Sequence, residues 1–328
     1  MRHRAAQNQK GLQIMDIKNV TVAGGGVLGS QIALQTAYKG FDVTVWLRSE
    51  DSIARAKPKF ERFAGIYTQT LEAMKTDKTA YARGLADSPD LEPAALDALK
   101  GNVAAAMESL RFTTDYDEAF GDADLVIEAV AEDPEQKIAF YTELAKHLPE
   151  KTIVVTNSST LLPSQFAEHT GRPEKYLALH FANTIWRNNT GEVMGHPGTS
   201  EEAYRAVVDF AAAIGMVPLE LHKEQPGYIL NSMLVPFLNS AEMLWAKDVA
   251  DPETIDKTWV LATGAPYGPF RILDVVGLET AYNIGIMNPK AHEEGTVENI
   301  IATRLKEMID RGETGINAGK GFYDYTQG

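Results

Sequence analysis

The chain has 328 residues, of which 44% are hydrophobic and 23% charged, and its formal net charge is −14. This length and composition suit a globular protein with two substantial cores. The acidic balance argues against nucleic acid or an anionic membrane as a partner, because phosphate-rich surfaces select basic proteins. The lack of cysteine excludes disulfides, a thiolate nucleophile and a cysteine-ligated metal. We therefore predict a cytoplasmic protein with no metal site.

No apolar run approaches the ~20 residues that span a bilayer, so no membrane segment is predicted. Met1 to Leu12 is polar and lacks the apolar core of a signal peptide. We predict that residues 1–15 form a disordered leader, with Met15 as a plausible original start.

The segment 19–33 contains Gly24-x-Gly26-x-x-Gly29 between a predicted apolar strand and a predicted helix. In this context the pattern is the dinucleotide-binding fingerprint. Gly24 permits a sharp turn, Gly26 lets the backbone approach a pyrophosphate, and Gly29 lets helix and strand pack closely. The free N–H groups and positive dipole of the helix face the phosphates. The predicted cofactor contacts in this turn are Gly24, Gly26, Val27, Leu28 and Gly29.

Predicted strands then alternate with predicted helices. The strands cover 41–47, 109–113, 123–129, 152–156 and 176–181, and the helices cover 51–74, 94–107 and 134–147. This alternation predicts a doubly wound, mostly parallel Rossmann-type sheet over residues 16–199. Ligands bind such sheets at the carboxyl ends of the strands. Gly24, Glu132, Ser159 and His180 all fall at such ends.

The composition shifts near residues 195–200, and the rest of the chain is mostly helical in pattern. The predicted helices cover 200–214, 226–248, 251–262, 270–286 and 296–311, and a short strand at 216–219 would extend the edge of the sheet. We predict that residues 200–328 form an all-α substrate and dimerisation domain. Asn231 lies on an apolar helix of this domain, so it is either a satisfied core amide or a site residue.

His180 ends an apolar strand, and Glu192 follows twelve residues later. By position alone, His180 is equally well explained as a satisfied core histidine or as a catalytic one. A carboxylate bonded to one ring nitrogen would orient the imidazole and stabilise its cation. The sequence alone does not bring the two side chains together.

Several further motifs occur in a fixed order. They are Glu128-Ala-Val-Ala-Glu132, Asn157-Ser-Ser159, Leu179-His-Phe-Ala-Asn183, Glu192-Val, Pro226-Gly-Tyr-Ile-Leu-Asn231, Gly264-Ala-Pro-x-Gly-Pro269 and Gly319-Lys-Gly-Phe-Tyr323. With the glycine motif, this set resembles the L-3-hydroxyacyl-CoA dehydrogenase family over about residues 16–326. The segments 158–163, 188–190 and 251–258 look closest to its bacterial diketoreductase branch.

The resemblance implies that His180 is the general acid–base and that Glu192 orients it. Ser159 would hydrogen-bond the reacting oxygen, and Asn231 would help to position the carbonyl. On the cofactor side, the resemblance implies roles for Glu132, Lys137, Asn183 and Lys320. It also implies a homodimer formed through the C-terminal helices.

Three departures from the family pattern affect the expected specificity. Leu47 stands where the family has the acid that holds the ribose of NAD, and Arg48 and Ser49 follow it. An arginine and a serine at this position can bind a 2′-phosphate, so NADP is favoured over NAD. Alternatively, Arg48 stacks on adenine, Glu50 or Asp51 supplies the carboxylate, and NAD binds.

The other two departures concern the substrate. The stretch from His180 to Thr184 lacks the family's proline, which predicts a looser substrate loop. Phe63 and Thr70 stand where the family's CoA-binding serine and lysine are expected, and a CoA phosphate calls for a basic side chain. A small β-keto or dicarbonyl substrate is therefore favoured over a long acyl-CoA.

We predict an NAD(P)-dependent oxidoreductase that interconverts 3-hydroxy and 3-oxo compounds. One alternative is an authentic short-chain 3-hydroxybutyryl-CoA dehydrogenase that uses NAD. An alternative of another class is a non-catalytic, cofactor-binding sensor or crystallin-like protein. The physiological substrate and the favoured direction do not follow from the sequence.

Overall fold

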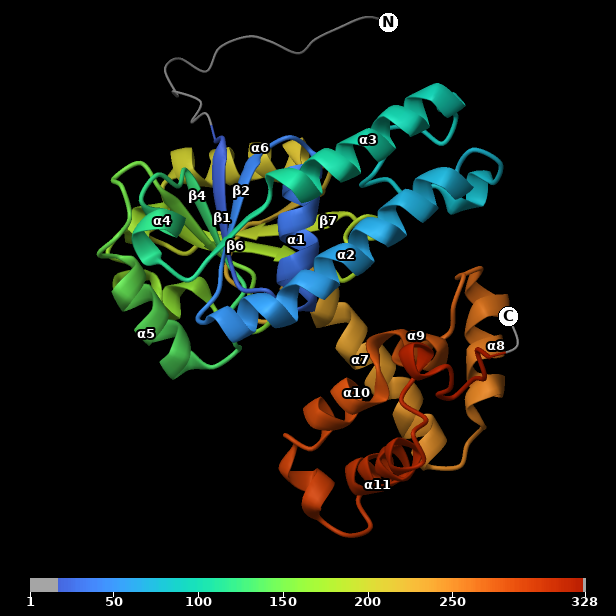
Figure 1. Ribbon diagram of the computed structural model, residues 1–328. Coiled ribbons are helices and arrows are strands. Elements are labelled where there is room, and N and C mark those ends of the chain that lie inside the picture. Colours follow the sequence, from blue (N-terminus) through green and yellow to red (C-terminus); the bar gives the residue numbers. More distant parts are fainter. Residues whose placement is uncertain (1–16, 327–328) are drawn as a thin grey trace, which may run out of the picture. The chain divides into compact units, whose positions relative to one another are not determined.

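The computed structural model describes residues 17–326 and divides into two compact units, Met1–Ile229 and Leu230–Gly328. The first unit is built on an eight-stranded sheet in the order β3-β2-β1-β4-β5-β6-β7-β8 (Figure 1). Strands β1 to β6 run parallel, whereas β7 is antiparallel to β6 and β8 is parallel to β7. The prediction of a doubly wound, mostly parallel sheet is confirmed.

The strands are β1 Asn19–Ala23, β2 Asp42–Trp46, β3 Arg111–Thr113, β4 Leu125–Glu128, β5 Ile153–Thr156, β6 Tyr176–Phe181, β7 Thr190–Met194 and β8 Val217–Leu221. The helices that begin in this unit are α1 Val27–Tyr38, α2 Glu50–Ala73, α3 Pro93–Ser109, α4 Tyr116–Phe120, α5 Pro134–Leu144, α6 Glu201–Ala213 and α7 Tyr228–Ala246. Short 3-10 turns occupy Lys78–Ala80, Pro163–Gln165, Ala167–Thr170 and Pro173–Lys175.

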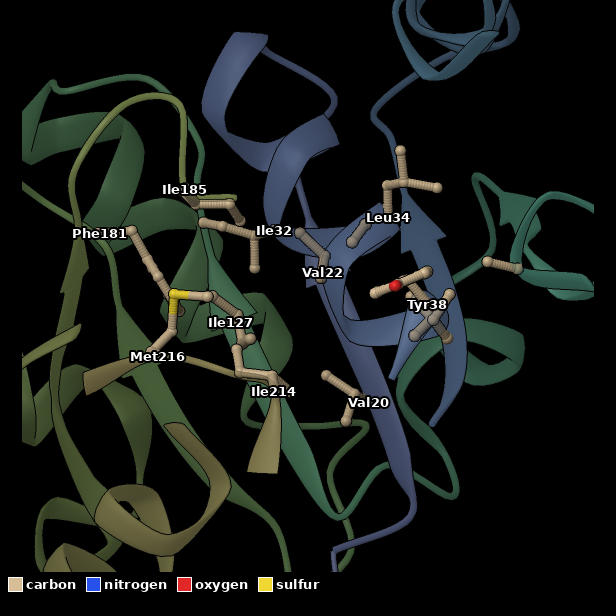
Figure 2. Packing of buried hydrophobic residues seen from close by; sticks show 14 of the residues in the cluster. Val20, Val22, Ile32, Leu34, Tyr38, Ile127, Phe181, Ile185, Ile214 and Met216 are labelled. Carbon is tan, nitrogen blue, oxygen red and sulfur yellow. The ribbon is translucent and has the colours of Figure 1, made fainter. Parts of the chain in front are cut away.

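Alternating strand residues divide between two cores, one on each face of the sheet. On the face covered by α1, α2, α3 and α6, Val22 of β1 and Ile127 of β4 pack with Ile32 of α1 (Figure 2). On the opposite face, Val126 and Val154 pack with Tyr141 of α5. Because both faces are covered, most residues of the central strands are apolar, and the buried Glu128 and Thr156 stand at the last positions of β4 and β5. The polar groups of the site are therefore confined to the strand ends.

The second unit contains most of α7 together with α8 Pro252–Thr263, α9 Pro269–Val276, α10 Leu278–Gly285 and α11 Val297–Asp310. One short 3-10 turn, Pro289–His292, precedes α11, and a second, Ile316–Ala318, follows it. Buried aspartates organise this unit. Asp256 of α8 accepts the backbone N–H groups of Phe270 and Arg271 at 2.8 and 2.9 Å, and so caps α9.

The structure differs from the elements predicted from the sequence at three points. The first compact unit runs to Ile229 rather than to 199, because α6 packs on the sheet and β8 pairs with β7. The helix expected over 270–286 is two helices, broken at Gly277, whose φ is +92°. Strand β7 was not expected, since its polar, glycine-containing sequence resembles a loop. The edge strand near 216–219 is present as β8, and the leader expected over 1–15 lies outside the described residues.

Candidate active site

The glycine turn after β1 has the geometry that close backbone packing requires. Gly24 has a φ of +127°, and a Cβ there would overlap the carbonyl of Ala129. A Cβ on Gly29 would overlap the carbonyl of Gly24, so α1 approaches β1 closely only without a side chain there. A Cβ on Gly26 would meet no atom within 4 Å, which leaves open space at the start of α1. This cradle fits a pyrophosphate.

Among the described helices, the first turn of α1 lacks the side-chain cap and the acidic residues that α2 and α5 carry. Within the described residues, no side chain caps α1, and no acidic residue lies in its first turn. By contrast, Ser49 caps α2 and Asp133 caps α5, each followed by acidic residues. The N–H groups at the start of α1 are therefore available to an anion. Val27 is 58% exposed beside them and offers an apolar contact.

The expected ribose-binding segment follows β2. Leu47 is buried, whereas Arg48 is exposed, and the Ser49 hydroxyl is engaged with Ser52. Lys59 was not predicted to lie at the cofactor site. Its Nζ donates a hydrogen bond to the carbonyl of Gly25, in the glycine turn, at 2.9 Å. Lys59 follows Arg55 by four residues on α2, so the two basic side chains lie on the same face of that helix. This spacing was the sequence signal for Lys59.

The β6–β7 hairpin brings the predicted catalytic pair together. In this antiparallel pairing His180 lies directly opposite Glu192, and residues paired in this way project from the same face of the sheet. The His180 Nδ1 lies 3.0 Å from Glu192 Oε2, and both side chains are buried. A carboxylate only accepts hydrogen bonds, so Nδ1 carries the proton and Nε2 keeps an unprotonated lone pair. Within residues 17–326, Nε2 makes no hydrogen bond.

The segment at the start of α7 completes the surroundings of this pair. The backbone N–H of Ile229 donates to Glu192 Oε1 at 2.9 Å. The ring of Tyr228 stacks on the His180 imidazole, with centroids 4.4 Å apart and planes 14° apart. Both oxygens of the buried carboxylate therefore accept hydrogen bonds, as a buried charge requires.

Glu132 organises the turn that carries Ser159. One of its carboxylate oxygens accepts from the Ser158 hydroxyl and from the backbone N–H of Ser159, the latter at 3.1 Å. Burial raises the pKa of Glu132, but the Ser158 hydroxyl and the Lys137 charge together bring this pKa below its ordinary value. Within the described part of the chain, the Ser159 hydroxyl makes no hydrogen bond, so it is available to a substrate oxygen.

The side chain of Lys137, a predicted cofactor residue, lies in the interior of the first unit. Its side chain is 1% exposed, and its Nζ lies 2.7 Å from Glu128 and 3.4 Å from Glu132. Glu128 also accepts hydrogen bonds from Tyr141 at 2.6 Å and from Thr156 at 2.7 Å. A lysine held between two carboxylates in the interior does not present its ammonium to a ligand.

The loop between His180 and Glu192 is tied to α1, contrary to the expected loosening. The side-chain oxygen of Gln31 accepts from the N–H groups of Thr184 and Ile185, at 2.9 and 3.3 Å. Thr184 has a φ of +62°, which proline cannot adopt. Ile185 belongs to the same core as Ile32 of α1 (Figure 2). The loop is thus fixed by an amide and apolar packing instead of a proline.

The remaining predicted residues lie in three places. Asn183 is exposed in this loop, and its carbonyl accepts from the Asn188 amide at 2.9 Å. Asn231 and Lys320 belong to the second unit, where Lys320 pairs with Glu313 at 2.8 Å. Their contributions to the site stay predictions.

A dinucleotide fingerprint, a mostly parallel sheet and a histidine–glutamate pair at one strand end define a nicotinamide-dependent oxidoreductase. Two family models account for nearly the whole described chain. The NAD-binding domain of 3-hydroxyacyl-CoA dehydrogenase matches residues 19–225, and the C-terminal domain matches residues 227–325. The chain belongs to the 3-hydroxyacyl-CoA dehydrogenase family, as the sequence motifs predicted.

Individual relatives agree with this assignment. The human mitochondrial hydroxyacyl-coenzyme A dehydrogenase is 31% identical over 94% of this chain and 91% of its own length. A probable 3-hydroxybutyryl-CoA dehydrogenase of Deinococcus radiodurans is 29% identical over 93% of this chain and 99% of its own length. The solved structure of a diketoreductase that acts on dicarbonyl compounds is 48% identical, with a TM-score of 0.80 over 94% of this chain and 99% of that one.

Proposed function

We propose that the protein reversibly reduces small 3-oxo or dicarbonyl compounds to 3-hydroxy compounds, with His180 and Glu192 as the proton-transfer pair. The observation that carries the proposal is the 3.0 Å contact between His180 Nδ1 and Glu192 Oε2 within a strand-paired hairpin. A histidine oriented in this way can give a proton from Nε2 and take one back at the same atom.

In the reducing direction, a bound NAD(P)H supplies the hydride that adds to the carbonyl carbon. His180 donates the Nε2 proton to the carbonyl oxygen, so that the product leaves as a neutral alcohol. Glu192 stabilises the imidazolium before the transfer and keeps the ring oriented after it. Ser159 donates a hydrogen bond to the same oxygen as negative charge develops there. In the oxidising direction His180 takes the alcohol proton.

A free keto substrate is favoured over a CoA thioester for two reasons. Phe63 and Thr70, where CoA contacts were expected, are both buried, so neither can reach a phosphate. The diketoreductase, with 48% identity, is more similar to this chain than the mitochondrial enzyme is. The second candidate, 3-hydroxybutyryl-CoA dehydrogenase activity, is favoured by the similarity to the probable 3-hydroxybutyryl-CoA dehydrogenase of Deinococcus radiodurans.

A substrate panel separates the two activities. We expect higher kcat/KM with a free 3,5-dioxo ester than with acetoacetyl-CoA, measured by nicotinamide absorbance. A preference for acetoacetyl-CoA would support the second candidate. Inactivity on both, with the coenzyme bound, would contradict the proposed function.

We further propose a preference for NADP, because Arg48 is exposed beside Leu47 and Lys59 adds positive charge at the glycine turn. Arg48→Ala should raise KM for NADPH by about tenfold and leave KM for NADH nearly unchanged. Leu47→Asp should shift the preference towards NADH. A larger effect of Arg48→Ala on NADH would reverse the assignment.

We propose that the protein is a homodimer through its helical unit. Apolar side chains there are widely exposed, including Met287 at 80%, Leu261 at 74% and Val249 at 64%. Light scattering after size-exclusion chromatography should give twice the chain mass of 35.9 kDa. Leu261→Lys in this surface tests the interface, and monomeric wild type would contradict the proposal.

A further inference from the structure

Tyr228 contacts both halves of the proton-transfer site. Its ring is stacked on His180, as described above, and its hydroxyl donates to the carbonyl of Ser158 at 2.7 Å. Ser158 directly precedes Ser159, the residue expected to bind the reacting oxygen. The side chain is 1% exposed. One rigid ring therefore spans the distance between the β6 histidine and the turn after β5.

The backbone at Tyr228 is held in an uncommon conformation. Gly227 and Tyr228 have φ values of +78° and +54°, and side-chain-bearing residues rarely adopt a positive φ. Such conformations persist where surrounding contacts determine them, and they concentrate at functional sites. Here the turn brings the ring onto His180 while the next N–H, from Ile229, bonds Glu192 at 2.9 Å.

We propose that Tyr228 is a positioning residue, whose ring fixes the tilt of the His180 imidazole and whose hydroxyl fixes the Ser159 turn relative to it. This inference rests on the proposed function, because it assigns Tyr228 to the same proton-transfer step. Proton transfer is sensitive to sub-ångström misplacement of the groups involved. Burial, followed by the nearby Glu132 charge, raises the pKa of Tyr228 well above its ordinary value. The hydroxyl is therefore a constant donor at working pH.

The test uses the full-length protein and separates ring from hydroxyl. Tyr228→Phe keeps the stacked ring and should lower kcat about threefold to tenfold, with coenzyme Kd and substrate KM within twofold of wild type. Tyr228→Leu removes the ring as well and should lower kcat by roughly 100-fold. Tyr176→Phe is the matched control, because Tyr176 is equally buried and its hydroxyl bonds Tyr141 at 2.9 Å. This control should keep wild-type kcat.

A double-mutant cycle shows whether the hydroxyl acts through the Ser159 turn. If it does, Tyr228→Phe should lower kcat by less than about twofold in a Ser159→Ala background, because the effects of substitutions at coupled residues do not add. Additive losses in the cycle, or wild-type kcat in Tyr228→Phe, would overturn the proposal. A loss of kcat that matches a loss of folded protein by circular dichroism would also overturn it.

A readout without substrate separates this inference from the proposed function. The Hε1 proton of His180 in the labelled protein should carry a ring-current shift that Tyr228→Phe keeps and Tyr228→Leu removes. An unchanged shift in Tyr228→Leu would overturn the role of the ring, whichever substrate the enzyme uses. Inactivity of wild type on every keto substrate would contradict the proposed function alone.

Discussion

Buried carboxylates have different surroundings in the two units of the chain. In the sheet unit, Glu128 accepts hydrogen bonds from a lysine, a tyrosine, a threonine and the N–H of Val130, and both oxygens of Glu192 are also engaged. In the helical unit, Glu242 is 6% exposed, yet within residues 17–326 its side chain makes no hydrogen bond. Burial alone raises the pKa of Glu242 to about 7.

The difference lies in the donors around each carboxyl group and not in the unit as a whole, because Asp256 of the helical unit also accepts three hydrogen bonds. A carboxylate with several fixed donors keeps its direction, as orienting a histidine requires. The Glu242 carboxyl group, with its pKa raised to about 7, exchanges its proton near neutral pH and does not orient a neighbouring side chain. Neutralising Glu242 should therefore raise the free energy of unfolding, whereas neutralising Glu128 should lower it.

The largest expected effect is the loss of proton transfer in the sheet unit. His180→Ala should lower kcat by roughly 10³–10⁴-fold and leave coenzyme Kd within about twofold, because the nucleotide cradle is built by other residues. Stopped-flow turnover and fluorescence titration of the coenzyme measure the two quantities. The exposed His169→Ala is the control and should be fully active. Equal losses of turnover and coenzyme binding would mean that His180 has a structural role.

Neutralising the paired carboxylate should destabilise the protein. Glu128→Gln leaves the buried Lys137 ammonium without its main partner, at a cost of about 3–5 kcal/mol in the free energy of unfolding. Urea denaturation followed by circular dichroism measures this difference. Lys146→Met removes an exposed ion pair with Glu143 and should have no measurable effect. Similar stability in both variants would show that burial of the pair is unimportant.

Neutralising the unpaired carboxyl should have the opposite sign and should depend on pH. The pKa of Glu242 is about 7 in the folded chain and about 4.3 when unfolded, so between these values the folded chain binds more protons. Stability contributed by this group is therefore lost as pH rises from about 4 to 7. Glu242→Gln should melt like wild type at pH 4 and be more stable at pH 8, by up to about 3 kcal/mol. A pH-independent difference would contradict the shifted pKa.

The smallest effect concerns the loop that follows His180. Gln31→Met removes the acceptor for two backbone N–H groups and should cost about 1–3 kcal/mol. Thr184→Gly should be neutral or stabilising, because glycine accepts the observed φ of +62°, whereas Thr184→Pro should disrupt the loop. Thermal melting ranks the three variants. A tolerated Thr184→Pro would mean that the loop adopts another conformation.

Local patterns were sufficient for most of the first unit. Each parallel strand was found within a few residues, because apolar runs bounded by turns and helices are a local signal. The glycine turn was predicted for the same reason. The hairpin was missed, because Thr190 to Met194 is not apolar enough to indicate a strand. Consequently no local pattern placed Glu192 opposite His180, although both residues were predicted as candidates.

Residue spacing and type predict the sheet class and the dinucleotide turn, because these features are encoded locally, and the resemblance to a family implies the acid–base residues. Only the tertiary structure decided which groups meet. The β6–β7 register pairs His180 with Glu192, burial turns Lys137 inward, and the turn at Tyr228 joins the histidine to the Ser159 segment. Contacts between residues far apart in the chain depend on packing, which no local pattern records.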